Sequence, residues 1–336
     1  MSASPQAAAV VASSPQSGWR RWLALLVRTP TLLVLVLTIA SFAARYNWRC
    51  EQVCHFRLQY GWLLLSAATV LVLAKDRRFA GVAACVAAVN FLCVLSIYWP
   101  ANQPRGESQA WKVISYNVLS SNQRYDDVLA MLRSEQADVV LVCEVNGAWA
   151  RELDSLSDVY PHRHIVASNN NFGIALLSRV PWRNVRSEML GSSGVISIVA
   201  EFDELGSPPF TFIGTHPLPP GSPQAAAARN SQLRAIAEFI RKRNRAAIVA
   251  GDLNVTSYSP YFHDLLQSAN LRDSRQGIGV QASWSPRIPL LFSIPIDHVL
   301  VSPEFEVVRR RVGEKLGSDH QPVIVELRQS PRSAKP

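Results

Sequence analysis

Eight polar side chains stand directly beside apolar, strand-like runs of this 336-residue sequence, at points where a run ends or begins. They are Asn117, Glu144, His216, Asp252, Asn254, Asp297, Asp319 and His320. One buried carboxylate or imidazole is usually structural, but that interpretation is hard to extend to eight residues at strand ends. Because a folded sheet can gather the ends of its strands at one edge, we expect these side chains to share one site.

The chemistry of this set is that of ligands for a hard metal ion. It contains carboxylates, amides and two imidazoles and no cysteine, which suits Mg²⁺ or Mn²⁺ better than zinc. Beside such a cation, a carboxylate can activate water and an imidazole can stabilise the transition state of phosphate-ester hydrolysis. The sequence has no nucleophile elbow, P-loop or dinucleotide-binding fingerprint, so acyl transfer and nucleotide-driven chemistry find no support.

The motifs that carry these residues resemble those of the endonuclease/exonuclease/phosphatase superfamily, which includes DNase I-like nucleases, sphingomyelinases and inositol phosphatases. In the order of that superfamily, they are SYN at 115–117, Glu144 at the end of a run, TH at 215–216, GDLN at 251–254, IDH at 296–298 and SDH at 318–320. The resemblance extends over residues 111–327. It implies a membrane-anchored, bacterial-type member with a DNase I-like fold, which is a four-layer α/β sandwich with two central sheets.

Applied residue by residue, the resemblance makes Glu144 the main metal ligand, with Asn117 beside it and Asp319 nearby. It gives Asp252 the role of positioning or deprotonating the attacking water. Asn254 would hold the phosphate. These five residues would form the half of the site that binds the metal and the water.

The resemblance also places His320 against the scissile phosphate, with its ring oriented by Asp297, and gives His216 a role at the leaving group or the phosphate. The chemistry agrees, because a carboxylate fixes the tautomer of an imidazole and supports its positive charge. Arg229 and Gln232 follow the THPLPP loop on a predicted helix. They either face the phosphate, which arginine binds through two hydrogen bonds, or lie on a solvated helix face.

The elements that must position these residues follow the pattern of an α/β domain. Strands are predicted at 111–116, 139–143, 174–177, 195–200, 210–215, 246–250, 296–301 and 322–327. Helices are predicted at 124–135 and 224–244. The Pro-rich and Gly-containing segment 101–108 indicates a linker, so the expected catalytic domain spans 109–329 and a tail follows at 330–336.

Three apolar stretches precede the linker, at 31–44, 58–74 and 79–99. A helix that crosses a bilayer needs about 20 mostly apolar residues, and these stretches lack the polar face that a soluble helical bundle would require. We therefore expect a membrane domain of three transmembrane helices over 23–100, after a polar leader at 1–22. A signal peptide is the alternative for the first stretch, and the later two spans would remain in that case.

Most of the basic excess behind the net charge of +9 belongs to this N-terminal third. Ten basic and two acidic residues precede Glu107, which leaves the catalytic domain close to neutral and without a general attraction for nucleic acid. Basic clusters at 241–245 and 309–311 are either a local nucleic-acid patch or solvated faces. The expected substrate is a phosphate ester of a nucleic acid, a phospholipid or a soluble compound, and no obligate protein partner is evident. The rival interpretation is a non-catalytic membrane receptor or scaffold that retains the fold.

Basic residues in the short loops favour an N-terminus inside the cell. Arg20, Arg21, Arg28, Lys75, Arg77 and Arg78 would then lie inside, against Arg45, Arg49, Arg57 and Arg105 outside. We expect a multi-pass protein of the inner or cell membrane whose catalytic domain lies on the outer side. There, Cys50 and Cys54 would either close a small disulfide or remain two thiols.

Overall fold

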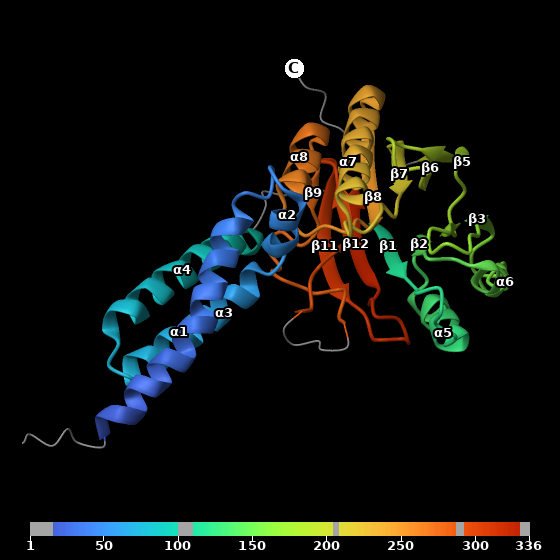
Figure 1. Cartoon of the computed structure of the whole chain (residues 1–336). Helices are drawn as coiled ribbons and strands as arrows, with labels where there is room; N and C mark the ends of the chain where they lie inside the picture. The colour runs from blue at the N-terminus through green and yellow to red at the C-terminus, as the bar shows by residue number, and fades with distance from the viewer. Residues whose placement is uncertain (1–15, 100–109, 204–207, 287–291, 330–336) are drawn as a thin grey trace, which may run out of the picture. The chain divides into compact units, whose positions relative to one another are not determined.

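The computed structural model describes residues 16–99, 110–203, 208–286 and 292–329 (Figure 1). The expected linker at 101–108, the tail at 330–336 and most of the leader lie outside these residues. By its contacts the chain divides into two units, one of Met1–Ile39 with Arg57–Leu92 and one of Ala40–Phe56 with Cys93–Pro336. The segment Ala40–Phe56 therefore groups with the second unit, which contains the expected catalytic domain and is called the catalytic unit below, although the sequence predicted a membrane domain over all of 23–100.

The first unit consists of three helices that expose much of their apolar surface. They are α1 (Gln16–Ser41), α3 (Arg57–Leu73) and α4 (Arg77–Leu95). The contacts between helices bury small residues such as Ala24 and Ala87 together with Leu64 and Leu71, whereas many large residues, such as Leu92, are exposed. Small side chains at helix contacts are typical of helices that associate within lipid.

Two helices of the described residues, Gly18–Ser41 and Arg77–Tyr98, are long and apolar enough to cross a membrane. A third span is counted only if the bent pair of α2 (Trp48–Cys54) and α3 is taken as one. Length and composition therefore give two or three spans where the sequence predicted three. Within α2, Cys50 and Cys54 are thiols and not a disulfide.

Two six-stranded sheets form the centre of the catalytic unit. The first has the order β11 (Phe305–Val312), β12 (Val323–Gln329), β1 (Ala110–Asn117), β2 (Val139–Cys143), β4 (Ile174–Ser178), β3 (His162–Val166). The second has the order β5 (Asn184–Met189), β6 (Ile196–Phe202), β7 (Phe210–Gly214), β8 (Ala246–Asp252), β10 (Asp297–Val301), β9 (Arg272–Asp273). Only β1 with β2 and β7 with β8 are parallel among these described strands.

Burial on both faces explains why the central strands are uninterrupted apolar runs. In β2, Val139 and Leu141 belong to the core between the two sheets, whereas Val140 and Val142 face the helices that cover the first sheet. Those helices are α5 (Tyr125–Glu135) and α6 (Gly147–Asp154), and the second sheet is covered by α7 (Pro223–Arg243) and α8 (Pro260–Ala269) (Figure 1). Three cores between four layers confirm the predicted α/β sandwich.

The helices begin and end at sequence signals for capping. Ser222 accepts a hydrogen bond from the backbone N–H of Ala225 and precedes Pro223 at the first turn of α7, while Asn244 ends that helix in the left-handed conformation. Ser259 and Pro260 start α8 in the same manner. The expected helix at 224–244 is thus α7, and it leads directly into β8, whose end carries part of the site.

Candidate functional site

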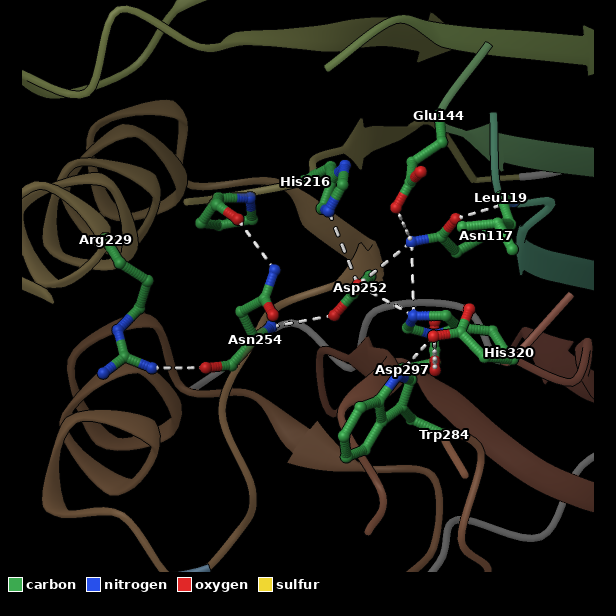
Figure 2. A network of polar contacts seen from close by, with 12 residues as sticks. Asn117, Leu119, Glu144, His216, Arg229, Asp252, Asn254, Trp284, Asp297 and His320 are labelled. Atoms are coloured by element: carbon green, nitrogen blue, oxygen red, sulfur yellow. Dashed lines mark hydrogen bonds and ion pairs between the residues drawn. The ribbon is translucent and has the colours of Figure 1, made fainter. Parts of the chain in front are cut away.

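The eight predicted side chains meet at one edge of the sandwich because the central strands of both sheets end or begin there. The parallel pairs β1/β2 and β7/β8 have their carboxyl ends at this edge, and the antiparallel strands β10 and β12 have their amino ends there. Figure 2 shows most of the group at close range. Strand direction therefore explains why residues from separate motifs share one site.

His320 is held between two buried carboxylates. Its Nδ1 lies 2.9 Å from Oδ2 of Asp297, its Nε2 lies 3.6 Å from Oδ2 of Asp252, and its backbone N–H donates to Oγ of Ser318 at 3.0 Å. Burial alone would lower the pKa of His320, but the charges of Asp297 and Asp252 outweigh burial and raise that pKa. The imidazole is therefore positively charged at neutral pH.

Asp252, the last residue of β8, lies at the centre of the group (Figure 2). Its Oδ2 lies 3.4 Å from Nε2 of His216 and accepts a hydrogen bond from Nδ2 of Asn117 at 3.2 Å, while its Oδ1 accepts the backbone N–H of Asn254 at 3.0 Å. Burial alone would raise the pKa of Asp252, but the imidazoles of His320 and His216 lower it. The carboxylate is therefore ionised and can hold and deprotonate a water molecule.

The residue before Asp252 has to be glycine. Gly251 has a φ of +147°, and a Cβ atom on it would lie 1.8 Å from the carbonyl oxygen of Thr215, next to His216. Only a residue without a side chain lets the end of β8 approach the TH motif this closely. The glycine of the GDLN motif thus brings Asp252 and His216 together.

Glu144 follows β2 with a φ of 64°, a left-handed conformation that is uncommon for residues with a side chain. Its Oε1 accepts a hydrogen bond from Nδ2 of Asn117 at 2.9 Å, and its Oε2 accepts the backbone N–H of Ser120 at 3.2 Å. Oδ1 of Asn117 accepts the backbone N–H of Leu119 at 3.1 Å, which fixes the orientation of that amide. These contacts keep the Glu144 carboxylate at the pocket.

One carboxylate oxygen of Asp319 accepts a hydrogen bond, and the other has no hydrogen-bond partner among the described residues. Its Oδ2 accepts a hydrogen bond from Nε1 of Trp284 at 2.9 Å, whereas its Oδ1 is buried and makes no hydrogen bond to a described residue. An unpaired buried carboxylate oxygen is costly unless it binds a proton or a cation. This oxygen is therefore suited to a ligand that the pocket would hold.

The donor set fits a hard divalent cation. The carboxylates of Glu144, Asp252 and Asp319 line one pocket that no described cysteine lines, and the unpaired Oδ1 of Asp319 is an available ligand. Among the described residues, the acidic and histidine side chains whose donor atoms lie within 4.8 Å of one another are Asp252, Asp297 and His320, and not the expected Glu144 and Asp319. Because Asp297 and His320 already bind each other, we assign those two to orienting the imidazole.

The pocket at this edge has a volume of about 490 Å³. Its polar side contains six of the eight predicted residues, and Asn117 and Asp297 lie behind them. Its apolar side includes Phe56, Phe172, Trp284 and Ile294. None of its described lining residues is a lysine or an arginine.

Sequence reasoning missed the apolar side of this pocket. Phe172 and its neighbours Asn170 and Asn171, which lie outside the predicted strands and helices, line it. Trp284 lies in a Ser-Trp-Ser stretch without strand or helix periodicity, so nothing in its spacing pointed to Asp319. An aromatic residue shortly before the IDH motif is the one available signal.

Arg229 does not line the pocket, in contrast to the expectation that it faces the phosphate. Its guanidinium is completely buried, donates from Nη1 to the carbonyl oxygen of Asn254 at 2.6 Å, and lies 2.6 Å from Oε1 of Glu51 (Figure 2 shows the first contact). Gln232 is also buried and donates to Oγ1 of Thr215 at 3.0 Å. Both residues support the loops of the site from behind, so neither lies on a solvated face.

His298 faces away from the pocket, as the alternation of side chains along a strand predicts. Its Nε2 lies 2.7 Å from the carbonyl oxygen of Val255, and burial lowers its pKa to about 3. The ring is therefore neutral and structural.

Comparison with known proteins gives one family match. Residues 114–320 match the model of the Endonuclease/Exonuclease/phosphatase family. A search of curated proteins found no match.

Solved structures of low sequence identity share the fold. One is the endonuclease/exonuclease/phosphatase from Bacteroides vulgatus, with 19% identity and a TM-score of 0.56 over 66% of this chain and 100% of that one. A second is humanized D. rerio TDP2, with 15% identity and a TM-score of 0.55 over 66% and 99%. A third is sphingomyelinase C from Streptomyces griseocarneus, with 20% identity and a TM-score of 0.50 over 65% and 99%. At these identities the likeness extends to the fold alone.

Proposed function

Since the chain belongs to the endonuclease/exonuclease/phosphatase family, whose members hydrolyse phosphate esters, we propose that it is a divalent-metal-dependent phosphoester hydrolase anchored in a membrane. The observation that carries this proposal is the geometry around Asp252. An ionised carboxylate lies between two imidazoles, one of them oriented by a second carboxylate, in a pocket large enough for a phosphate ester.

Four residues of the pocket carry out the steps of the proposed hydrolysis. Asp252 holds a water molecule and takes its proton as the water oxygen attacks phosphorus. The imidazolium of His320 donates a hydrogen bond to a phosphoryl oxygen and stabilises the charge that develops there. The bond from phosphorus to the leaving oxygen breaks, and His216 supplies the proton that this oxygen needs. Asn254, at the same pocket, contacts the phosphate.

A cation completes this arrangement. Mg²⁺ or Mn²⁺ held by Glu144 and Asp319, with Asn117 beside them, would offset the negative charge of the phosphoryl oxygens. The unpaired Oδ1 of Asp319 and the absence of cysteine from the described lining support this assignment.

For the substrate, we propose a phosphate ester with an apolar or uncharged group, such as a phospholipid. The aromatic and aliphatic side of the pocket can bury apolar atoms, and its described lining offers no lysine or arginine to a polyanion. Three arginines of the basic clusters have partners within the chain: Arg243 pairs with Glu201, Arg311 pairs with Glu135, and Arg310 is buried and donates to Ser274. A nuclease remains the alternative.

For the location, we propose a multi-pass protein of the inner or cell membrane with the catalytic domain on the outer side. Two or three helices of sufficient length and apolarity support the anchor. The orientation rests on the excess of basic residues in the loops that would lie inside.

The test is hydrolysis by the full chain in lipid nanodiscs, with Mg²⁺ or Mn²⁺ and with chelator. The panel contains a phospholipid, a generic phosphodiester, an inositol phosphate, single-stranded DNA and duplex DNA. Glu144→Ala and His320→Ala should lose at least about 100-fold in kcat, because each removes a group that stabilises the transition state. The matched controls Glu238→Ala and His263→Ala change exposed side chains on α7 and α8.

Full activity in Glu144→Ala or His320→Ala would contradict the proposal. The rival, a receptor or scaffold, predicts no turnover of any substrate in the panel. Calorimetric titration of the same samples with Mg²⁺ or Mn²⁺ shows whether the protein binds the ion and whether that binding requires Glu144. Rapid cleavage of DNA with no cleavage of lipid would select the nuclease alternative.

A further inference from the structure

The segment Ala40–Phe56, which lies in the sequence between two apolar helices, packs into the catalytic unit. Its short helix α2 begins at the N-cap Asn47, whose side chain accepts the backbone N–H of Arg49. Gln52, His55 and Phe56 at the end of this segment line the same pocket as Asp252 and His320. Part of the pocket wall therefore comes from residues that the sequence assigned to the membrane domain.

A buried ion pair connects α2 to α7 in the interior of this unit. Oε1 of Glu51 lies 2.6 Å from Nη2 of Arg229 and accepts a hydrogen bond from Oγ of Ser259 at 2.6 Å. The side chain of Glu51 is 1% exposed and that of Arg229 is not exposed at all. A charge this deeply buried needs its partner, because no water is available to replace it.

The ion pair is linked to the catalytic carboxylate through one residue. Nη1 of Arg229 donates to the carbonyl oxygen of Asn254 at 2.6 Å, and the backbone N–H of Asn254 donates to Oδ1 of Asp252 at 3.0 Å (Figure 2). Asn254 has a φ of 50°, a left-handed conformation that its surroundings must maintain. Glu51 thus fixes Arg229, Arg229 fixes Asn254, and Asn254 orients Asp252.

The segment Ala40–Phe56 makes further contacts around the site. Nδ1 of His55 lies 2.9 Å from Oγ1 of Thr256 in the loop between β8 and α8, and Nε2 of Gln52 donates to the carbonyl oxygen of Pro220 in the loop between β7 and α7. At the surface, both terminal nitrogens of Arg45 lie 2.7 Å from the carboxylate of Asp264 on α8. Several independent contacts therefore hold Ala40–Phe56 against these two loops and α8.

We infer that α2 is part of the active site and that Glu51 is a positioning residue, which holds Asn254 and Asp252 in the reactive geometry through Arg229. This inference rests on the proposed function for its effect on turnover. The placement of the loop itself can be measured without any substrate. Because small displacements of a catalytic group are costly in rate, a loosened loop should act mainly on kcat.

The experiment compares Glu51→Gln and Arg229→Lys with the wild type as full chains in nanodiscs. Glu51→Gln removes the charge and keeps the shape of the side chain. Arg229→Lys keeps the charge opposite Glu51. An ammonium group, however, lacks the planar set of N–H donors with which the guanidinium binds both Glu51 and the carbonyl oxygen of Asn254. The control is Arg49→Gln, which changes an exposed residue on the same helix.

The first readout is amide hydrogen exchange, which needs no substrate. We expect residues 252–259 to exchange at least about tenfold faster in Glu51→Gln and Arg229→Lys, with the sheets unchanged and Arg49→Gln like the wild type. The second readout is kinetic. We expect kcat per folded molecule to fall at least about tenfold with KM changed less than about threefold, whereas a merely structural role would lower only the folded fraction.

The outcomes separate the two proposals. Wild-type exchange at residues 252–259 in both folded variants would overturn the role of Glu51, whatever the activity. A wild type that cleaves nothing, together with faster loop exchange in the variants, would overturn the proposed function and retain the link between α2 and the loop. Wild-type kcat in variants whose loop does exchange faster would overturn the positioning role.

Discussion

The His320 ring lies between two carboxylates, with Asp297 at one ring nitrogen and Asp252 near the other. Asp297 does not reach the pocket and is fully buried, so its effect on a substrate passes through the ring. A carboxylate in this place fixes which nitrogen carries a proton and supports the charged form of the imidazole. Asp297 is thus best tested by a change that keeps its shape.

The first prediction concerns this carboxylate. Asp297→Asn should lower kcat about 10- to 100-fold, because the amide no longer supports the charge on His320. The measurement is steady-state hydrolysis by the full chain, with folding checked by circular dichroism. Asp154→Asn, at an exposed end of α6, is the control and should match the wild type. A kcat for Asp297→Asn equal to that of the control would mean that the imidazole needs no carboxylate partner.

The site could be predicted from the sequence where its residues are tied to strand ends. Glu144 and Asp252 follow apolar runs, so their common edge could be inferred from strand direction, although their roles remain proposals. Arg229 could not be placed, because its partner Glu51 lies 178 positions earlier in the chain. Trp284 and Phe172 lie outside regular elements, where side-chain position depends on tertiary packing.

At the scale of elements, the second sheet contains a close approach between the end of β8 and Thr215, just after β7. Gly251→Ala tests this approach. Its Cβ would collide with the carbonyl oxygen of Thr215, so we expect the variant to unfold at least about 5 °C lower. Thermal unfolding is followed by circular dichroism. Gly147→Ala, whose Cβ would meet nothing closer than 4.0 Å, should shift the transition by less than about 2 °C.

The helix α2 supplies an apolar wall as well as an ion pair. Phe56, just after α2, packs edge to face against Phe292 at 5.9 Å between ring centroids. We predict that Phe56→Ala raises KM about tenfold for a substrate with an acyl chain, because part of the apolar pocket wall is lost, and changes KM little for a short-chain analogue. Equal effects on both substrates would show that the apolar group of the substrate binds elsewhere.

The strength of the apolar pattern decided which elements could be predicted. The eight predicted strands correspond to β1, β2, β4, β6, β7, β8, β10 and β12. Those that were missed include β5, which has no buried residue, β9, which has two residues, and β11, which contains three consecutive arginines. Edge strands lack the burial on both faces that makes a central strand visible in the sequence. The short helices α6 and α8 were missed because neither contains more than ten residues.

At the scale of the whole molecule, the uneven distribution of basic residues among the N-terminal loops predicts a membrane topology that can be measured. We predict that the C-terminus lies outside, so a C-terminal fusion to alkaline phosphatase should be active and a fusion to green fluorescent protein should be dark. Changing Arg77 and Arg78 to Glu removes two of the basic residues expected inside and should reduce the preference for this membrane orientation. The reverse pattern of reporter signals would place the catalytic unit in the cytoplasm.

The path of the chain through the two units limits how this protein can be rearranged in evolution. The catalytic unit is discontinuous, since Ala40–Phe56 enters it before Arg57–Leu92 leaves it again. A recombination event at the linker would pass on a catalytic domain whose Arg229 is a buried cation with no counter-ion. We therefore expect that a catalytic domain separated from Ala40–Phe56 would have to replace Arg229 or supply a new acid at its side.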